Sequence, residues 1–193
     1  MYVKIKKILV LSGTPHENSF TAELNKYFLG HMNMYGLSCV SYIDSYKATV
    51  KPCIDCKICR REQTCVFHDM DEIDKLLRES DIIVISTPVY NMSFPAPLKA
   101  IFDRFQRYYS ARFYMNIKPP IKKHKKAILL ATCGSEDLRG IEIMKLQLER
   151  IFTIMNTELI DTIVWSGTDN KNFDIQAYKK KTEKKIIKFL DSI

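Results

Sequence analysis

The chain has 193 residues, 46% of them hydrophobic, which fits one domain with a single substantial core. No apolar run approaches the ~18 residues of a membrane span, and Ile8–Leu11 is short of the ~7–15 apolar residues of a signal peptide. The sequence therefore argues against a membrane protein or a secreted one, and we expect a single domain over residues 1–193 in the cytoplasm, where thiols stay reduced.

Basic residues exceed acidic ones by 30 to 22, a net charge of +8, and much of the excess lies in two lysine-rich runs, residues 122–126 and 179–185. Such runs bind nucleic acid or acidic partners in some proteins and form a solvated surface in others. Neither run is accompanied by a helix-turn-helix or an aromatic nucleic-acid motif, so a solvated surface is the favoured interpretation.

Apolar, β-branched runs alternate with segments of helical period along the chain. Strands are predicted at residues 3–11, 37–43, 81–87, 127–133 and 159–165. Helices are predicted at residues 19–34, 69–79, 95–108, 138–155 and 174–190, with an irregular excursion at 109–126. Five strand-then-helix units predict an α/β fold: a doubly wound, five-stranded parallel sheet with helices on both faces.

Local signals mark several helix starts. Asp69, followed three residues later by Glu72, is a candidate N-cap with a capping-box partner, so the cysteine-rich loop at 51–68 is expected to end there. Pro95 and Pro97 open the next helix, at positions where proline is tolerated. Ser135 is a candidate cap for the helix after the fourth strand.

The first strand-to-helix loop, residues 12–21, is rich in hydroxyl and amide side chains around a helix start. Free backbone N–H groups and the positive end of the helix dipole would receive a phosphate there. The loop has neither the glycine pattern of a dinucleotide fold nor a P-loop lysine, so a phosphate monoester held by neutral donors is one interpretation and an ordinary capped turn is the other.

Two further loops lie on the same edge of the predicted sheet. Residues 87–92 combine a stiff Pro88 with apolar side chains and exposed amides, which suit stacking and hydrogen bonding to a fused heteroaromatic ring. In residues 132–135, Gly134 allows the backbone to approach a ligand closely. The carboxyl ends of parallel strands are where open α/β sheets bind ligands.

Three segments together resemble the flavodoxin-like FMN oxidoreductases, which include NAD(P)H-dependent FMN reductases and iron–sulfur flavoproteins. They are LSGTPHENSFT, TPVYNMSFPAPLKAIFDR and CIDCKICRREQTC. The resemblance implies the strand order 2-1-3-4-5 and an FMN site. The implied FMN contacts are Ser12, Thr14, His16, Asn18, Ser19, Phe20 and Thr21 at the phosphate, Thr87, Pro88, Val89, Tyr90, Asn91 and Met92 at the ring, and Thr132, Cys133, Gly134 and Ser135 at its pyrimidine side. His16 departs from the family pattern, which usually has arginine there.

Four of the six cysteines form a compact motif with the spacing C-x2-C-x2-C-x5-C: Cys53, Cys56, Cys59 and Cys65. The first three have the spacing with which one segment holds several corners of an iron–sulfur cluster. The motif resembles the [4Fe–4S] site of the iron–sulfur flavoproteins, and it also admits a zinc site or a set of plain thiols. Cys39 and Cys133 are interpreted as small core residues.

The resulting hypothesis is an FMN-dependent oxidoreductase whose chemistry belongs to the cofactor, with no catalytic side chain. NAD(P)H, or a ferredoxin acting through a cluster, would supply electrons, and a quinone, another small molecule or a redox protein would accept them. The resemblance also implies a homodimer, with the helix from Pro95 and the excursion at 109–126 as candidate interface. The alternatives are a flavodoxin-type carrier, although such carriers are usually acidic, and a nucleic-acid-binding module.

Overall fold

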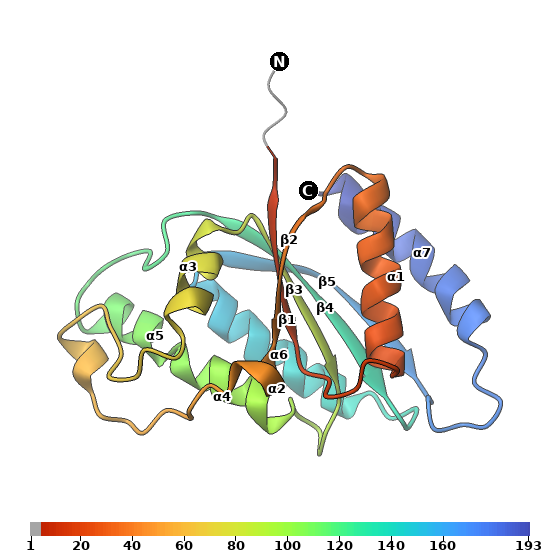
Figure 1. The fold of residues 1–193 in the computed structure, drawn as a ribbon, viewed down its shortest axis with the longest axis horizontal. Helices are drawn as coiled ribbons and strands as arrows, with labels where there is room; N and C mark the ends of the chain where they lie inside the picture. Colours follow the sequence, from red (N-terminus) through yellow and green to blue (C-terminus); the bar gives the residue numbers. More distant parts are fainter. Residues whose placement is uncertain (1–4) are drawn as a thin grey trace.

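A computed structural model describes residues 5–193 of the protein, and the centre of the fold is one five-stranded, all-parallel sheet (Figure 1). The strands are β1 (Lys7–Ser12), β2 (Cys39–Asp44), β3 (Ile82–Pro88), β4 (Lys125–Cys133) and β5 (Thr157–Ser166). Their order in the sheet is β2-β1-β3-β4-β5, which confirms the predicted doubly wound topology. The order reverses beside β1, so the loops after β1 and β3 border the crevice where such folds bind ligands.

Helices cover both faces of the sheet, with α1 and α7 together on one face (Figure 1). The helices are α1 (Phe20–Met34), α2 (Ser45–Ala48), α3 (Asp71–Glu79), α4 (Ala96–Arg104), α5 (Gln106–Phe113), α6 (Arg139–Ile154) and α7 (Ile175–Asp191), and residues Ile58–Arg60 form a 3-10 turn, η1. Among residues 5–193, no helix is both long and apolar enough to cross a membrane.

Two hydrophobic cores lie on opposite faces of the sheet because successive strand residues point to opposite sides. In β1, Leu9 and Leu11 belong to the core under α3 to α6, whereas Ile8 and Val10 belong to the core under α1 and α7. This arrangement explains why the strands are apolar at consecutive positions, since both of their faces are buried.

The helix predicted at 95–108 is two helices, because α4 ends at Arg104 and α5 begins at Gln106. Helix α5 runs on to Phe113, so the irregular excursion is shorter than the predicted 109–126. Residues 3 and 4 of the predicted first strand lie outside the described residues. The four-residue helix α2, which the Asp44 side chain caps, was too short to show a period in the sequence.

The predicted cap at Asp69 is wrong. Met70 occupies the N-cap position of α3 and makes no side-chain hydrogen bond there. The Asp69 carboxylate instead accepts the Lys51 N–H at 2.8 Å and lies 2.8 Å from the Arg104 guanidinium. Burial alone would raise the pKa of Asp69, but these donors and the charge of Arg104 hold it below its ordinary value. Asp69 therefore closes the cysteine-rich loop rather than starting the helix.

Candidate functional site

The three loops singled out in the sequence meet at the carboxyl edge of the sheet, at the bottom of Figure 1. The Gly13 N–H donates to the Ser86 carbonyl at 2.8 Å, which joins the first loop to β3. The Val89 N–H donates to the Thr132 carbonyl at 2.8 Å, which joins the second loop to the third. The fold therefore gathers residues that are more than 100 positions apart in the chain into one site.

The first loop is built around the start of α1. Ser19 is the N-cap residue: its Oγ accepts the Ala22 N–H at 3.2 Å, donates to the His16 carbonyl at 3.0 Å and lies 3.1 Å from the Thr14 hydroxyl. The cap satisfies the Ala22 N–H. Helix geometry leaves the N–H groups of Phe20 and Thr21, the first two residues of α1, without an intrahelical acceptor, so they are available to an external one. Asn18, His16 and Phe20 are exposed around this helix start.

Four buried hydroxyl groups lie below the start of α1. Ser12, Ser86 and Thr132 lie on β1, β3 and β4, and strand alternation turns them toward the α1 face of the sheet. Thr21 on α1 is also buried, and its Oγ1 lies 2.6 Å from the Thr132 Oγ1. The Ser12 and Ser86 hydroxyls have no hydrogen-bond partner, which is uncommon for buried polar atoms and is expected where a polar ligand or water completes a site.

The second loop forms a tight turn at its tip. The N–H groups of Tyr90 and Ser93 each donate to the other residue's carbonyl at 2.9 Å, and the two residues between them, Asn91 and Met92, have φ of 49° and 61°. Left-handed backbone is unfavourable for methionine, and such strained positions cluster at ligand sites. The turn exposes the side chains of Tyr90 and Met92. Thr87, buried below the turn, donates its hydroxyl to the Pro88 carbonyl at 2.9 Å.

The third loop is joined to a segment that the sequence analysis missed, the connection between β5 and α7. The N–H groups of Gly167, Thr168 and Asp169 donate to the carbonyls of Ser135, Cys133 and Gly134 respectively, at 2.9 to 3.2 Å. A Cβ on Gly134 would lie 2.1 Å from an Asp169 carboxylate oxygen, so the space beside this glycine belongs to Asp169. The turn-forming sequence GTDN after the fifth strand was the available signal for this fourth loop.

The structure confirms the prediction that Cys133 is buried and contradicts two other predictions, those for Ser135 and Cys39. Cys133 is buried, as predicted, and burial raises the pKa of its thiol, which donates to the Ser135 carbonyl at 3.2 Å. Ser135 does not cap α6, because the N-cap position belongs to Leu138. Cys39, also predicted to be a core residue, is exposed on the edge strand β2.

An FMN molecule fits these features. Phosphate oxygens are acceptors for the free N–H groups and hydroxyls at the start of α1, and that end of the helix favours negative charge. No lysine or arginine lies within the first loop, residues 12–21. The exposed turn at 90–93 and the third loop lie beside this position, and their apolar side chains and backbone amides suit a flat heteroaromatic ring.

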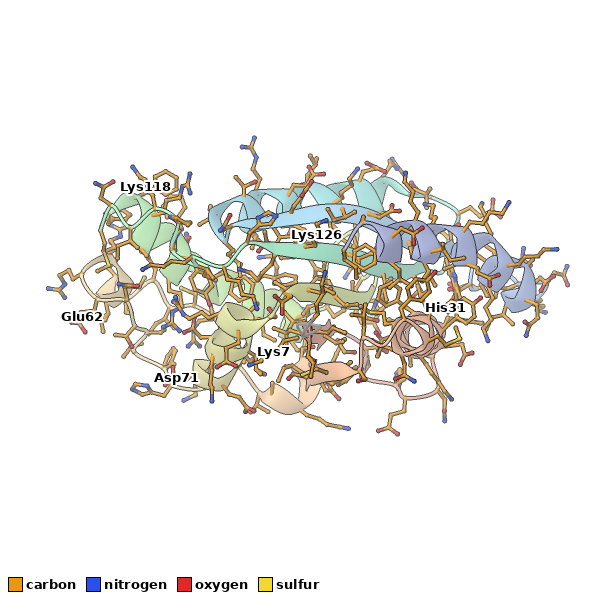
Figure 2. All side chains as sticks on the ribbon, turned by 90° about the horizontal axis from the view of Figure 1, so that it is seen from above. Lys7, His31, Glu62, Asp71, Lys118 and Lys126 are labelled. Carbon is orange, nitrogen blue, oxygen red and sulfur yellow. The ribbon has the colours of Figure 1, made fainter. Side chains whose placement is uncertain are left out.

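The four motif cysteines are free thiols that line one cavity of about 60 Å³. The cavity is lined mainly by the cysteine-rich loop, residues 51–68, and by α5. Glu62 of that loop lies at one end of the molecule, beside Lys118, and His31 of α1 lies toward the other end (Figure 2). Within the described residues, no three His, Cys, Asp or Glu side chains are arranged around a single metal ion. The Cys59 thiol donates to the Ser110 hydroxyl of α5 at 3.3 Å.

The remaining polar lining of the cysteine cavity is mostly cationic. Four of its lining residues are basic, Lys57, Arg60, Arg104 and Arg107, and one is acidic, Asp55. A thiolate-bound iron–sulfur cluster is larger than a single ion and carries negative charge, so both the donor set and the charge of this cavity fit such a group.

A family model for the flavodoxin-like fold matches residues 6–186 of the chain. An FMN-dependent NADH:quinone oxidoreductase of Pelagibacter ubique is 34% identical over 137 residues, which cover 67% of this chain and 69% of that protein.

An iron–sulfur flavoprotein of Methanocaldococcus jannaschii is 32% identical over 99 residues, so the match spans about half the length of each protein (51%). Among solved structures, an NAD(P)H:quinone oxidoreductase from Methanothermobacter marburgensis superposes with a TM-score of 0.76 at 18% identity, covering 95% of both chains. At that identity the superposition supports the fold.

Proposed function

The chain belongs to the flavodoxin-like fold family, and on that premise we propose that it is an FMN-dependent oxidoreductase that moves electrons from NADH to a small acceptor such as a quinone. The observation that carries the proposal is the start of α1, where unpartnered buried hydroxyls lie beside free backbone donors at the switch point of the sheet. When bound, FMN supplies the chemistry by accepting a hydride at its ring and returning the electrons to an acceptor.

The protein's part in this function is to bind and orient the cofactor. The first loop holds the phosphate with hydroxyls and the N–H groups at the start of α1. The turn at 90–93 offers the N–H groups of Asn91 and Met92 to one edge of the ring, and residues 132–135 lie along the pyrimidine side of the ring. The hydrogen bonds between the third loop and residues 167–169 keep that side in place.

Ser19 is the residue with which to test the phosphate site. Thr21 is less suitable, because its bond to Thr132 joins two loops and its removal would disturb more than a ligand contact. In Ser19→Ala, we expect FMN affinity to fall at least about tenfold, because hydrogen bonds to a charged group contribute roughly 1.5–3 kcal/mol. Fluorescence titration of FMN into the apoprotein measures the affinity.

Asp174→Ala is the matched control. Asp174 caps α7 by accepting the N–H groups of Gln176 and Ala177, so its removal costs a comparable helix cap, about 1 kcal/mol, at a helix start outside residues 12–21. Equal FMN affinity in Ser19→Ala and in the parent protein would refute the assignment of this loop.

Turnover separates an enzyme from a flavodoxin-type carrier. We expect the FMN-loaded protein to oxidise NADH continuously when a soluble quinone is present, with NADPH tested in parallel. A protein that binds FMN tightly but consumes neither nucleotide would be an electron carrier, and the enzymatic proposal would be withdrawn.

We further propose that the cysteine cavity holds a [4Fe–4S] cluster, with Cys53, Cys56, Cys59 and Cys65 as its ligands. When bound, such a cluster transfers single electrons. The cavity's cationic lining and the similarity to iron–sulfur flavoproteins support this proposal. In anaerobically purified Cys56→Ala we expect iron and acid-labile sulfide to be lost while FMN is retained. A parent protein without iron or sulfide would show that these cysteines are not a cluster site.

The homodimer is a proposal as well. Three aromatic residues of α5 and its C-cap are exposed in the region expected to form the interface: Tyr109, Phe113 and Tyr114, with 39%, 57% and 53% of their surface exposed. Exposed aromatic residues are enriched at protein interfaces. Sedimentation should show a dimer for the parent protein and a monomer for Phe113→Glu. A monomeric parent protein at micromolar concentration would refute the proposal.

A further inference from the structure

Two arginines of the cysteine cavity are almost completely buried. Arg104 is the last residue of α4 and Arg107 lies in the first turn of α5, and only 3% and 8% of their surfaces are exposed. Both residues line the cavity together with the four cysteines. Burying a guanidinium is costly unless ion pairs and hydrogen bonds compensate for the lost water. We therefore compare the N–H groups of each arginine with the acceptors that surround it.

Arg104 closes the cysteine-rich loop. Its Nη1 donates to the Lys51 carbonyl at 2.9 Å and its Nη2 to the Phe67 carbonyl at 3.0 Å, while Asp69 lies 2.8 Å away. These contacts fix both ends of the loop to the end of α4. Cys65 lines the same cavity as Arg104.

Arg107 holds the middle of the same loop. Its Nη2 donates to the Gln63 carbonyl at 3.1 Å, and the closest carboxylate, that of Asp74, is 3.8 Å away. Asp74 is shared, because it also accepts from Arg78 at 3.0 Å and from the Tyr108 hydroxyl at 2.5 Å. One carboxylate therefore serves two guanidinium groups.

Each arginine keeps a buried N–H group without an acceptor, Nε of Arg104 and Nη1 of Arg107. Unsatisfied buried donors on charged side chains are costly, and they indicate that an anionic acceptor completes the site. The four thiol sulfurs line the same cavity, and as thiolates they would be such acceptors.

We propose that Arg104 and Arg107, the arginine pair, act as positioning residues for the [4Fe–4S] cluster, an inference that rests on the cluster part of the proposed function. The pair fixes the cysteine-rich loop and places positive charge and N–H donors beside the cysteine sulfurs. Positive charge and hydrogen bonds near the sulfurs stabilise the reduced, more negative form of a cluster, so the pair raises its reduction potential and slows the loss of iron.

The test compares Arg107→Gln and Arg107→Lys with Arg112→Gln as the matched control. Arg112 lies on the same helix, and its replacement removes the same charge, but it is not part of the cavity lining. Arg104→Lys is a second variant that keeps the charge while losing the planar, multiple donation to the two loop carbonyls. All proteins are prepared anaerobically with iron and sulfide, and thermal unfolding and FMN content verify that each one is folded.

Two readouts are independent of enzyme turnover: the rate at which a chelator removes iron, and the reduction potential from a titration followed by electron paramagnetic resonance. We expect Arg107→Gln to lose iron roughly tenfold faster or more and to have a lower potential, with Arg107→Lys between it and the parent protein. Arg112→Gln should match the parent protein.

The outcomes separate the two proposals. If the parent protein holds iron and sulfide, and the Arg104 and Arg107 variants match Arg112→Gln in both readouts, the arginine pair has no role toward the cluster and this inference is wrong. If the parent protein binds FMN but no iron, the cluster proposal fails together with this inference, and the flavin part of the proposed function stands.

Discussion

Gly13 is required by the close approach of the first loop to β3 and α4. A Cβ at this position would lie 2.7 Å from Leu98 Cδ2 and 2.8 Å from Thr87 Oγ1, and both neighbours are fully buried. We therefore expect Gly13→Ala to lower the free energy of unfolding by about 1–3 kcal/mol, because overpacking forces buried side chains out of place. Urea unfolding measures the change.

Gly30→Ala is the control for that substitution. Gly30 lies within α1, and a Cβ there meets no atom within 4 Å. Alanine is the better helix former, so this variant should be more stable than the parent protein by about 0.5–1 kcal/mol. If both substitutions changed stability equally, the close approach at Gly13 would not be the cause.

Gly134 is a second glycine that a close neighbour requires, but that neighbour is of a different kind. The sequence predicts close approach of a ligand at this glycine, and the structure adds a second reason for it, because the Asp169 carboxylate occupies the space that a Cβ would take. Asp169 is 35 positions away and reaches Gly134 only because the β5–α7 connection folds over the third loop. A local pattern could not reveal that neighbour.

Lys125 connects the start of β4 to the end of α6. It lies within a run expected to be solvated, yet only 1% of its surface is exposed, and its Nζ donates to the carbonyls of Lys123 at 2.9 Å and Met155 at 3.1 Å. The Met155 carbonyl belongs to the C-cap residue of α6, so this lysine satisfies a helix end. At least one lysine of the first lysine-rich run is therefore buried and part of the fold, which weakens the case for a nucleic-acid-binding surface.

The pH dependence of stability follows from this burial. Burial, with the nearby charges of Lys123 and Arg78, lowers the pKa of Lys125 to about 8, whereas the unfolded chain keeps the ordinary value of 10.5. Between these values the unfolded state binds more protons, so the free energy of unfolding contributed by Lys125 rises with pH.

We expect the stability of the parent protein to rise relative to Lys125→Met by up to roughly 3 kcal/mol between pH 8 and 10.5. Chemical unfolding of both proteins across this range measures the difference, and the other titrating groups cancel in the comparison. A constant difference would mean that the Lys125 amine keeps its ordinary pKa.

At the scale of the whole molecule, the sheet is shared by two cores, and we expect them to unfold together as one domain. Leu129 belongs to the core under α3 to α6, whereas Trp165, the single tryptophan, belongs to the core under α1 and α7. Leu129→Ala should lower the free energy of unfolding by about 2–5 kcal/mol. The unfolding transitions followed by Trp165 fluorescence and by circular dichroism should both shift, and their midpoints should remain equal.

Separate midpoints for the two probes would mean that the faces of the sheet unfold independently, contrary to a single cooperative domain. Ile128→Ala, the neighbouring position in β4, is the matched variant on the tryptophan face. Its midpoints should coincide as well, because both cores share the backbone of the same strand.

The sequence by itself determined the class and order of the main elements. Five apolar, β-branched runs alternate with amphipathic segments, and this pattern is a local consequence of burying both faces of a parallel sheet. The three loops of the candidate site were predictable for the same reason, since the carboxyl ends of parallel strands share one edge. The strand order came from the family resemblance and is confirmed.

Tertiary structure alone decided which distant groups became partners. Asp69 looked like a helix cap, but the buried guanidinium of Arg104, 35 positions away, competes for its carboxylate and forms the stronger, charge-assisted contact. The burial of Lys125, the closure of the third loop by Asp169 and the joining of Arg104 and Arg107 to the cysteine cavity have the same origin. Periodicity and turn chemistry report a residue's neighbours along the chain, whereas charge pairing depends on neighbours that only folding supplies.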